Sequence, residues 1–151
     1  MQLIGFNYTK IEGIRNKDID KIPSINTDVQ FIKIEKENVG ITMEQETMKV
    51  SFSYIITYAE TIEEAQKKEN LQGSITFNGN MILAMTKDEA AKIMKDWKKE
   101  QINVEVKAAL INILIRKCTA KAIQLEEDLH LPFHVPLPLV QPQSQKKEVD
   151  I

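Results

Sequence analysis

Cysteine is almost absent from this chain of 151 residues, because Cys118 is its single example. One cysteine cannot form an intrachain disulfide, so the cross-linked framework of small secreted domains is excluded. The sequence also lacks an apolar run of the roughly 20 residues that a transmembrane helix requires, and it lacks a basic leader before an apolar run at its start. We therefore expect a cytoplasmic protein with no integral membrane segment.

An excess of charge of one sign is missing as well. The formal net charge is -2, and acidic and basic residues alternate along the chain without forming a block. Proteins that capture nucleic acid electrostatically need a concentrated positive surface. The sequence therefore predicts no nucleic-acid partner.

Groups that catalyse reactions or hold metals are equally scarce. The two histidines, His130 and His134, have the i, i+4 spacing of a helical zinc site, but Pro132 between them excludes a helix there. In an extended chain the two side chains would lie roughly 13 Å apart, which is too far to share one ion. Cys118 lies within an apolar stripe, where a thiol usually serves as a small core residue. We expect no enzyme, no metal site and no cofactor.

Alternating apolar residues predict a sheet in the first part of the chain. The clearest strand covers residues 48–58, and the others are expected at residues 4–8, 29–34 and 71–83. Because the connections are short, neighbouring strands should pair antiparallel, which predicts a meander of about four strands. A charged turn at residues 60–70 separates the last two strands.

Local irregularities are expected at two places in these strands. The alternation changes phase at Phe31 and Ile32, which predicts a bulge or a strand buried on both faces. Gly73 and Gly79 lie in no phosphate-binding motif and predict a bulge and a turn, with Asn78 and Gly79 leading into the apolar run that follows.

Two helices are expected after the strands. Thr86 and Glu89 have the spacing of a capping box, in which both side chains satisfy backbone N–H groups at the start of a helix. The apolar residues that follow at helical spacing share one face: Ala90, Ile93, Met94 and Trp97.

The second helix is longer, is expected to start after Asn103, and has two apolar stripes. A helix that covers one face of a single sheet needs only one such stripe. The second therefore predicts contact with another subunit or a bound partner, unless the first helix or the C-terminal segment folds back onto it. One stripe contains Val106, Leu110, Ile113 and Leu114, and the other contains Ile111, Ile115, Cys118, Ala122 and Leu125.

A proline-rich apolar arm, residues 129–140, follows the long helix. Pro132, Pro136 and Pro138 each lack an N–H donor and push the preceding residue out of helical geometry, so the arm must run extended. Its apolar side chains form a strip that soluble proteins cover with their own core or reserve for a partner. We divide the chain into a single α+β domain at residues 1–140 and a polar, flexible tail at residues 141–151.

The order of these parts resembles the SecB-like chaperones, which bind unfolded or partly folded polypeptides. The likeness rests on three stretches: residues 6–14, residues 50–58 with 71–79, and residues 125–139. In the third stretch, Leu129-His-Leu-Pro132 is similar to the Leu-x-Leu-x-Pro segment that follows the long helix of the family.

The resemblance implies a homo-oligomer, typically a dimer of dimers, whose apolar grooves hold extended client segments without ATP, with protein export as one of the roles that it leaves open. The tail is mixed in charge, unlike the strongly acidic tails of many bacterial members, which leaves binding to a SecA-type translocation motor open. By position in the family's groove, the residues expected to contact client are Leu71, Ile75, Phe77, Leu131 and Phe133.

Three alternatives remain at this point. A structural oligomerisation protein would use the same helix and arm without a client. An acyl-chain-binding protein of the hot-dog type would also place a sheet beside a long apolar helix, although those folds have the main helix among the strands. An enzyme would require carboxylates such as Glu60, Glu63 and Glu105 to converge in a cleft.

Overall fold

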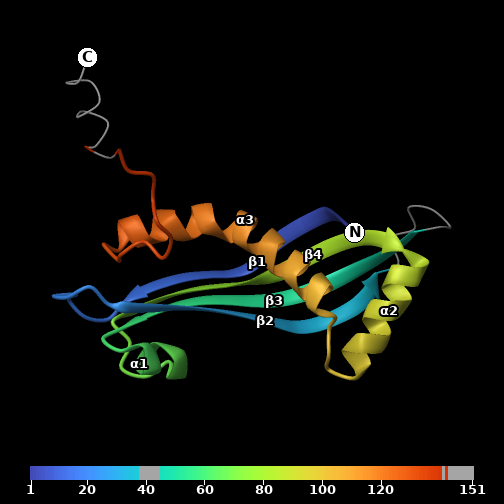
Figure 1. Ribbon diagram of the computed structural model, residues 1–151, viewed down its shortest axis with the longest axis horizontal. Helices are drawn as coiled ribbons and strands as arrows, with labels where there is room; N and C mark the ends of the chain where they lie inside the picture. Colours follow the sequence, from blue (N-terminus) through green and yellow to red (C-terminus); the bar gives the residue numbers. More distant parts are fainter. Residues whose placement is uncertain (38–44, 141, 143–151) are drawn as a thin grey trace, which may run out of the picture.

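A computed structural model describes residues 1–37, 45–140 and 142. Four strands form one antiparallel sheet, α3 lies along one face of it, and α1 and α2 lie near its opposite ends (Figure 1). The expected α+β fold, a four-stranded antiparallel sheet followed by a short and a long helix, is confirmed. The elements are β1 (Gln2–Arg15), β2 (Ser24–Glu37), β3 (Gln45–Ala59), α1 (Ile62–Lys67), β4 (Gly73–Thr86), α2 (Lys87–Lys98) and α3 (Val104–Asp128).

The strand order is β1-β4-β3-β2, so the expected meander holds for β2, β3 and β4 and is wrong for β1. The connection between β1 and β2, residues 16–23, is longer than a tight hairpin loop and carries the chain across the end of the sheet. Asn16 holds this connection in place, because its backbone N–H donates to the carbonyl of Gln72 at 2.8 Å. As a result, β1 and β2 are the two edges of the sheet.

The expected turn at Asn78 and Gly79 is wrong, because β4 runs through both residues as one strand. Gly79 pairs with Phe52 on one side and with Tyr8 on the other. A Cβ atom at Gly79 would lie 2.2 Å from the carbonyl oxygen of Asn7, so the glycine marks a close approach of two backbones. The Asn-Gly signal is local, whereas the alternation of buried residues continues across it and determines the strand.

The expected irregularity in β2 is confirmed. The pairing with β3 shifts between Phe31 and Lys33, which leaves Ile32 59% exposed. The bulge expected at Gly73 is absent from its pairings, and the register shifts of β1 lie elsewhere, between Leu3 and Gly5 and between Tyr8 and Lys10.

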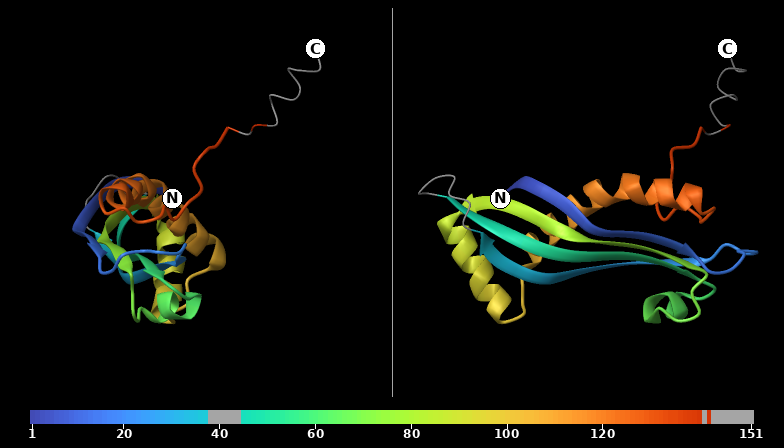
Figure 2. Two further views of the ribbon diagram at one scale, coloured as in Figure 1. Left: turned by 90° about the vertical axis from the view of Figure 1, so that its left-hand side faces the viewer. Right: turned by 180° about the vertical axis from the view of Figure 1, so that it is seen from behind.

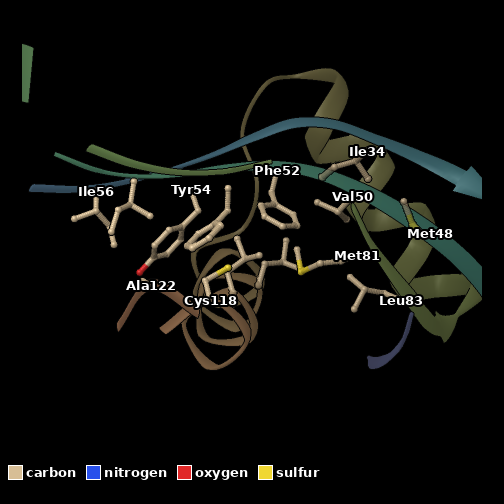
Figure 3. Packing of buried hydrophobic residues seen from close by; sticks show 14 of the residues in the cluster. Ile34, Met48, Val50, Phe52, Tyr54, Ile56, Met81, Leu83, Cys118 and Ala122 are labelled. Carbon is tan, nitrogen blue, oxygen red and sulfur yellow. The ribbon is translucent and has the colours of Figure 1, made fainter. Parts of the chain in front are cut away.

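The core lies between the sheet and α3, and it is built from alternate residues of β3 and β4. Figure 3 shows Phe52, Tyr54 and Ile56 pointing from β3 towards Cys118 and Ala122 of α3. Burying side chains of this size is the main favourable term in folding, at about 1.5–3 kcal/mol for each large residue. The strands supply the following fully or almost fully buried residues: Met48, Val50, Phe52, Tyr54, Ile56, Tyr58, Ile75, Phe77, Met81 and Leu83.

Both short helices begin with the same capping arrangement. Thr86 accepts a hydrogen bond from the N–H of Glu89 at 3.2 Å, which confirms the expected start of α2. Thr61 and Glu64 repeat this arrangement at the start of α1, a helix that was expected to be a charged turn. The Thr-x-x-Glu spacing at residues 61–64 could have predicted α1. No helix in the described part of the chain is both long and apolar enough to span a bilayer.

The long helix buries a row that draws on both expected stripes. Leu110, Leu114, Cys118 and Ala122 lie at i, i+4 spacing against the sheet, and Glu126 continues the row. The expected division into two stripes is therefore wrong in detail, because apolar periodicity does not fix how a helix is rotated against its sheet. Two residues of the second stripe, Ile111 and Ile115, lie beside this row and remain partly exposed.

The buried thiol of Cys118 leads to a first prediction. Burial raises the pKa of Cys118 to about 11, although a hydrogen bond from Tyr8 opposes the shift. Because the thiolate is the reactive form, we expect the folded protein to react with a disulfide reagent at pH 8 at least about 100-fold more slowly than the protein in urea. The rates of thiol release measure this difference. Equal rates in the two states would show that Cys118 is accessible.

Candidate functional site

A hollow lies between the edge strand β2 and the long helix α3. Its volume is about 430 Å³, and Tyr54 of β3 lies among the residues around it. From β2 it is bordered by Thr27 and Val29. From α3 it is bordered by one helical row at i, i+4 spacing: Lys107, Ile111, Ile115 and Thr119.

A second hollow of about 630 Å³ continues the first towards α2. The two hollows share Val29 and Lys107, so they form one channel, which we call the β2–α3 groove. The α2 end is bordered by apolar and polar side chains together: Phe31, Trp97 and Ile102 with Gln30, Glu100 and Gln101. The groove is therefore apolar around Ile111 and Ile115 and mixed in polarity at its α2 end, with Lys107 as a basic side chain near its middle.

The groove exists because α3 packs over the centre of the sheet and leaves the β2 side uncovered. The buried row of α3 contacts the core formed by β3 and β4, whereas the neighbouring Ile111 and Ile115 face the space above β2. Ile115 is 43% exposed, and the inward-facing Val29 and Phe31 of β2 are only half-buried. An uncovered apolar surface of this kind is typical of a binding site.

The outer edge of β2 adds backbone groups to the groove. β2 pairs only with β3 in the described sheet, so alternate N–H and C=O groups along its other edge have no strand partner there. A free edge of this kind can accept a further extended strand through main-chain hydrogen bonds. The combination of a groove with an apolar half and a free edge suits an extended polypeptide.

A sharp turn at the end of α3 directs the arm back towards the sheet. His130 has a φ of 54°, and Leu131 donates its N–H to the carbonyl of Glu126 at 2.8 Å. This is the Schellman arrangement, with a histidine where glycine is usual. From Leu131 to Val140 the chain forms neither helix nor strand and bends at His134 and Val135, which confirms that the arm is not helical.

A buried polar cluster holds the start of the arm. The carboxylate of Glu126 is fully buried and accepts hydrogen bonds from the Tyr58 hydroxyl and from the backbone N–H of His134, the latter at 2.9 Å. The Nδ1 atom of His134 lies 2.9 Å from the same carboxylate. Burial and the hydrogen bond to Glu126 raise the pKa of Tyr58 far above its usual value, so its hydroxyl remains a donor. The cluster places Val135 at the end of the groove.

The structure separates the five residues that were expected to contact client. Ile75 and Phe77 are fully buried in the core and Leu131 is 4% exposed, so these three side chains are not available to a ligand in this conformation. Leu71 is half-buried in the loop before β4. Phe133 is 38% exposed and borders a different hollow of about 450 Å³, on the Arg15 side of the arm.

In the described conformation α3 lies against the expected groove wall on β4, and client contact at these five residues stays a prediction. Alternation correctly identified Ile75 and Phe77 as one face of a strand, but α3 covers that face in the described chain. The groove residues that were missed come from β2, α2 and α3, for example Val29, Trp97 and Ile115. Ile111 and Ile115 had a signal in the sequence, because they belong to the stripe that was predicted to meet a partner.

The carboxylates of the enzymatic alternative do not meet. Glu60 and Glu63 lie next to and within α1, whereas Glu105 lies in the first turn of α3 towards the other end of the sheet (Figure 1). Within the described residues, no group of three or more histidine, cysteine or acidic side chains is arranged to hold a metal ion.

Comparison with known proteins gives a likeness to solved structures, one of which is a chaperone. No known family matches the sequence, and no curated protein is similar to it. The chain is similar to a SecB-like chaperone from Mycobacterium tuberculosis, solved in complex with a ChAD peptide from the HigA1 antitoxin. The two share 12% identity, the alignment covers 93% of this chain and 91% of the other, and the TM-score is 0.47. At this level, the likeness assigns neither a family nor a function to this chain.

Proposed function

We propose that this protein is an ATP-independent chaperone that binds extended apolar segments of unfolded or partly folded polypeptides in the β2–α3 groove. The observation that carries this proposal is a groove, apolar around Ile111 and Ile115, that runs beside a free sheet edge. Its apolar residues can bury alternate side chains of a bound segment, while β2 can pair with the backbone of that segment. Binding of this kind needs no nucleotide and selects weakly for sequence, as the sequence resemblance to SecB-like chaperones also implied.

Charge placed in the groove tests this proposal. We expect Ile111→Asp with Ile115→Asp to weaken binding of a fluorescently labelled apolar peptide by about 10-fold or more, because a carboxylate there cannot be covered by an apolar ligand. The same variant should lose the ability to suppress aggregation of a chemically unfolded protein without nucleotide. Peptide affinity is read from fluorescence anisotropy, and aggregation from light scattering.

A matched control keeps the charge change and moves it out of the groove. Ile22 is 95% exposed in the β1–β2 connection and Val104 is 82% exposed at the first position of α3, and neither residue borders the groove. Ile22→Asp with Val104→Asp should therefore bind peptide as the wild type does. If the two double variants bound the peptide with equal affinity, the peptide would not bind in the β2–α3 groove.

Comparison of peptide binding with fatty-acid binding separates the remaining alternatives. A protein that binds a fatty acid but no peptide would be an acyl-chain binder, and one that binds neither would serve in oligomerisation alone. We propose a homo-oligomer, because Ile4, Ile11 and Ile14 of the edge strand β1 are each about 40% exposed and could meet a second copy. Light scattering coupled to size exclusion measures the mass of the free protein in the same preparation.

A further inference from the structure

We propose that residues 135–140 of the arm form a strap that closes over the β2–α3 groove of the same chain and competes with the polypeptide ligand. This inference rests on the proposed function and adds a form of regulation to it. It follows from three features of the described residues, which are the position of Val135, the spacing of the apolar side chains and the placement of the prolines.

The first feature is continuity between the arm and the groove. His134 is held by Glu126, and the next residue, Val135, already borders the groove near Thr27. Beyond this point the arm leaves the body of the molecule (Figure 2). Its apolar side chains then become increasingly uncovered, with Leu137 at 42%, Leu139 at 81% and Val140 at 94% exposure. An uncovered apolar segment therefore starts at the apolar end of the β2–α3 groove.

The second feature is the match in spacing between the arm and β2. In extended chains, alternate side chains lie on the same face and neighbouring strands have nearly the same rise per residue. Thr27, Val29 and Phe31 are the inward-facing residues of β2 along the groove. If the arm continues from Val135 alongside β2 in the parallel direction, Leu137 lies opposite Val29 and Leu139 lies opposite Phe31. Both leucines then fill the groove beneath the exposed side of α3.

The third feature is the pair of prolines. In a strand, successive residues direct their backbone N–H and C=O groups to opposite edges, so Leu137 and Leu139 can both donate towards β2. Pro136 and Pro138 then face away from β2 and have no N–H to offer. The strap can thus pair with the free edge on one side, while it presents an edge that lacks two donors to any further chain. Such a strand covers the edge of β2 and hinders the addition of a further strand.

The short connection between His134, which Glu126 holds, and the strap makes closure an intramolecular event. Only Val135 and Pro136 lie between His134 and Leu137, so the strap stays near the groove at an effective concentration of the order of millimolar. A polypeptide ligand must displace the strap, and its apparent affinity falls by the fraction of chains whose groove is open. The described conformation, with the arm away from the body, is the open one.

The protein contains its own reporter for closure. Trp97 is the single tryptophan and borders the groove beside Phe31, where Leu139 and Val140 would arrive. A nitroxide attached to Val140→Cys quenches tryptophan fluorescence only at contact range, and it leaves Leu137 and Leu139 in place. The buried thiol of Cys118 should not react with the label. We expect Trp97 emission to fall at least about 2-fold on labelling, to the same extent at every protein concentration.

Two further variants make this measurement decisive. A nitroxide at Ile22→Cys, in the connection at the other end of the sheet, should leave Trp97 emission unchanged. Adding Leu137→Asp and Leu139→Asp to the labelled protein should restore emission, because the strap can no longer enter the groove. Unquenched emission in the labelled Val140→Cys protein would overturn the strap. Quenching that disappears on dilution would overturn it too, by assigning the groove to the arm of a second copy.

Peptide binding distinguishes failure of the strap from failure of the proposed function. We expect Leu137→Asp with Leu139→Asp to bind the labelled apolar peptide about 3- to 10-fold more tightly than the wild type, because the competitor is removed. Unchanged affinity would refute competition and leave the chaperone proposal intact. If no variant binds peptide but Trp97 is quenched, the strap stands as a self-contact and the chaperone proposal fails.

Discussion

Replacement of Glu126 by alanine should lower the free energy of unfolding by about 3 kcal/mol or more, which is the size expected when one partner of a buried polar cluster is removed. The fully buried carboxylate of Glu126 accepts hydrogen bonds from the Tyr58 hydroxyl and the His134 backbone N–H. The Nδ1 atom of His134 lies within hydrogen-bond distance of the same carboxylate. Without the carboxylate, all three groups lose their shared partner. Urea unfolding followed by circular dichroism measures the change.

The neighbouring residue provides a matched control. Glu127 lies on the same helix turn but is exposed, so Glu127→Ala should change stability by less than about 0.5 kcal/mol. Glu126→Gln keeps the shape and one acceptor, and it should fall between the two alanine variants. Similar losses for Glu126→Ala and Glu127→Ala would show that the buried cluster contributes nothing particular to stability.

Replacement of Gly79 by alanine should also be strongly destabilising, by about 3 kcal/mol. The added methyl group would lie 2.2 Å from the carbonyl oxygen of Asn7 and 3.0 Å from the ring of Phe52. Because Asn7 contributes a backbone atom of a paired strand, β1 would have to move away from β4, which breaks ladder hydrogen bonds and opens the core. The midpoint of thermal unfolding should fall by well over 5 °C in a domain of this size.

A second glycine in the same strand pair shows whether the effect is specific. At Gly5 the nearest atoms to an added Cβ are Cβ and Cγ1 of Ile82, both at 3.2 Å, so a relative shift of the two strands by a few tenths of an ångström would relieve the contact. Gly5→Ala should therefore cost about 1 kcal/mol or less. If Gly79→Ala proved as mild as Gly5→Ala, the close approach of β1 and β4 would be wrong.

Local patterns in the sequence predicted most of the elements of this fold. Unbroken alternation identified β3, the phase change at Phe31 identified the irregularity in β2, and Thr86 with Glu89 identified the start of α2. These signals succeed because the burial period of a strand and the capping of a helix depend on residues close together in the chain. The same logic failed at Gly79, where a local turn signal competed with a longer strand pattern.

The position of the groove could not be predicted in the same way. It depends on β1 pairing with β4 instead of β2, and on which row of α3 faces the sheet, and both are contacts between distant parts of the chain. Alternation shows that Ile75 and Phe77 share a face, but it does not show whether a helix or a ligand covers that face. The one local signal for the groove was the second apolar stripe of the long helix, which contains Ile111 and Ile115.

The pairing of β1 with β4 also constrains the order in which the sheet can form. Gln2 lies opposite Ala84, so the first of these four strands to be synthesised has its partner at the end of the last of them. β2, β3 and β4 can pair in succession as they are made, whereas β1 must wait until β4 exists. During that interval the apolar side of β1, including Phe6 and Tyr8, has no sheet to join. A protein that we propose to shield unfolded chains thus passes through a stage in which its own N-terminal strand needs shielding.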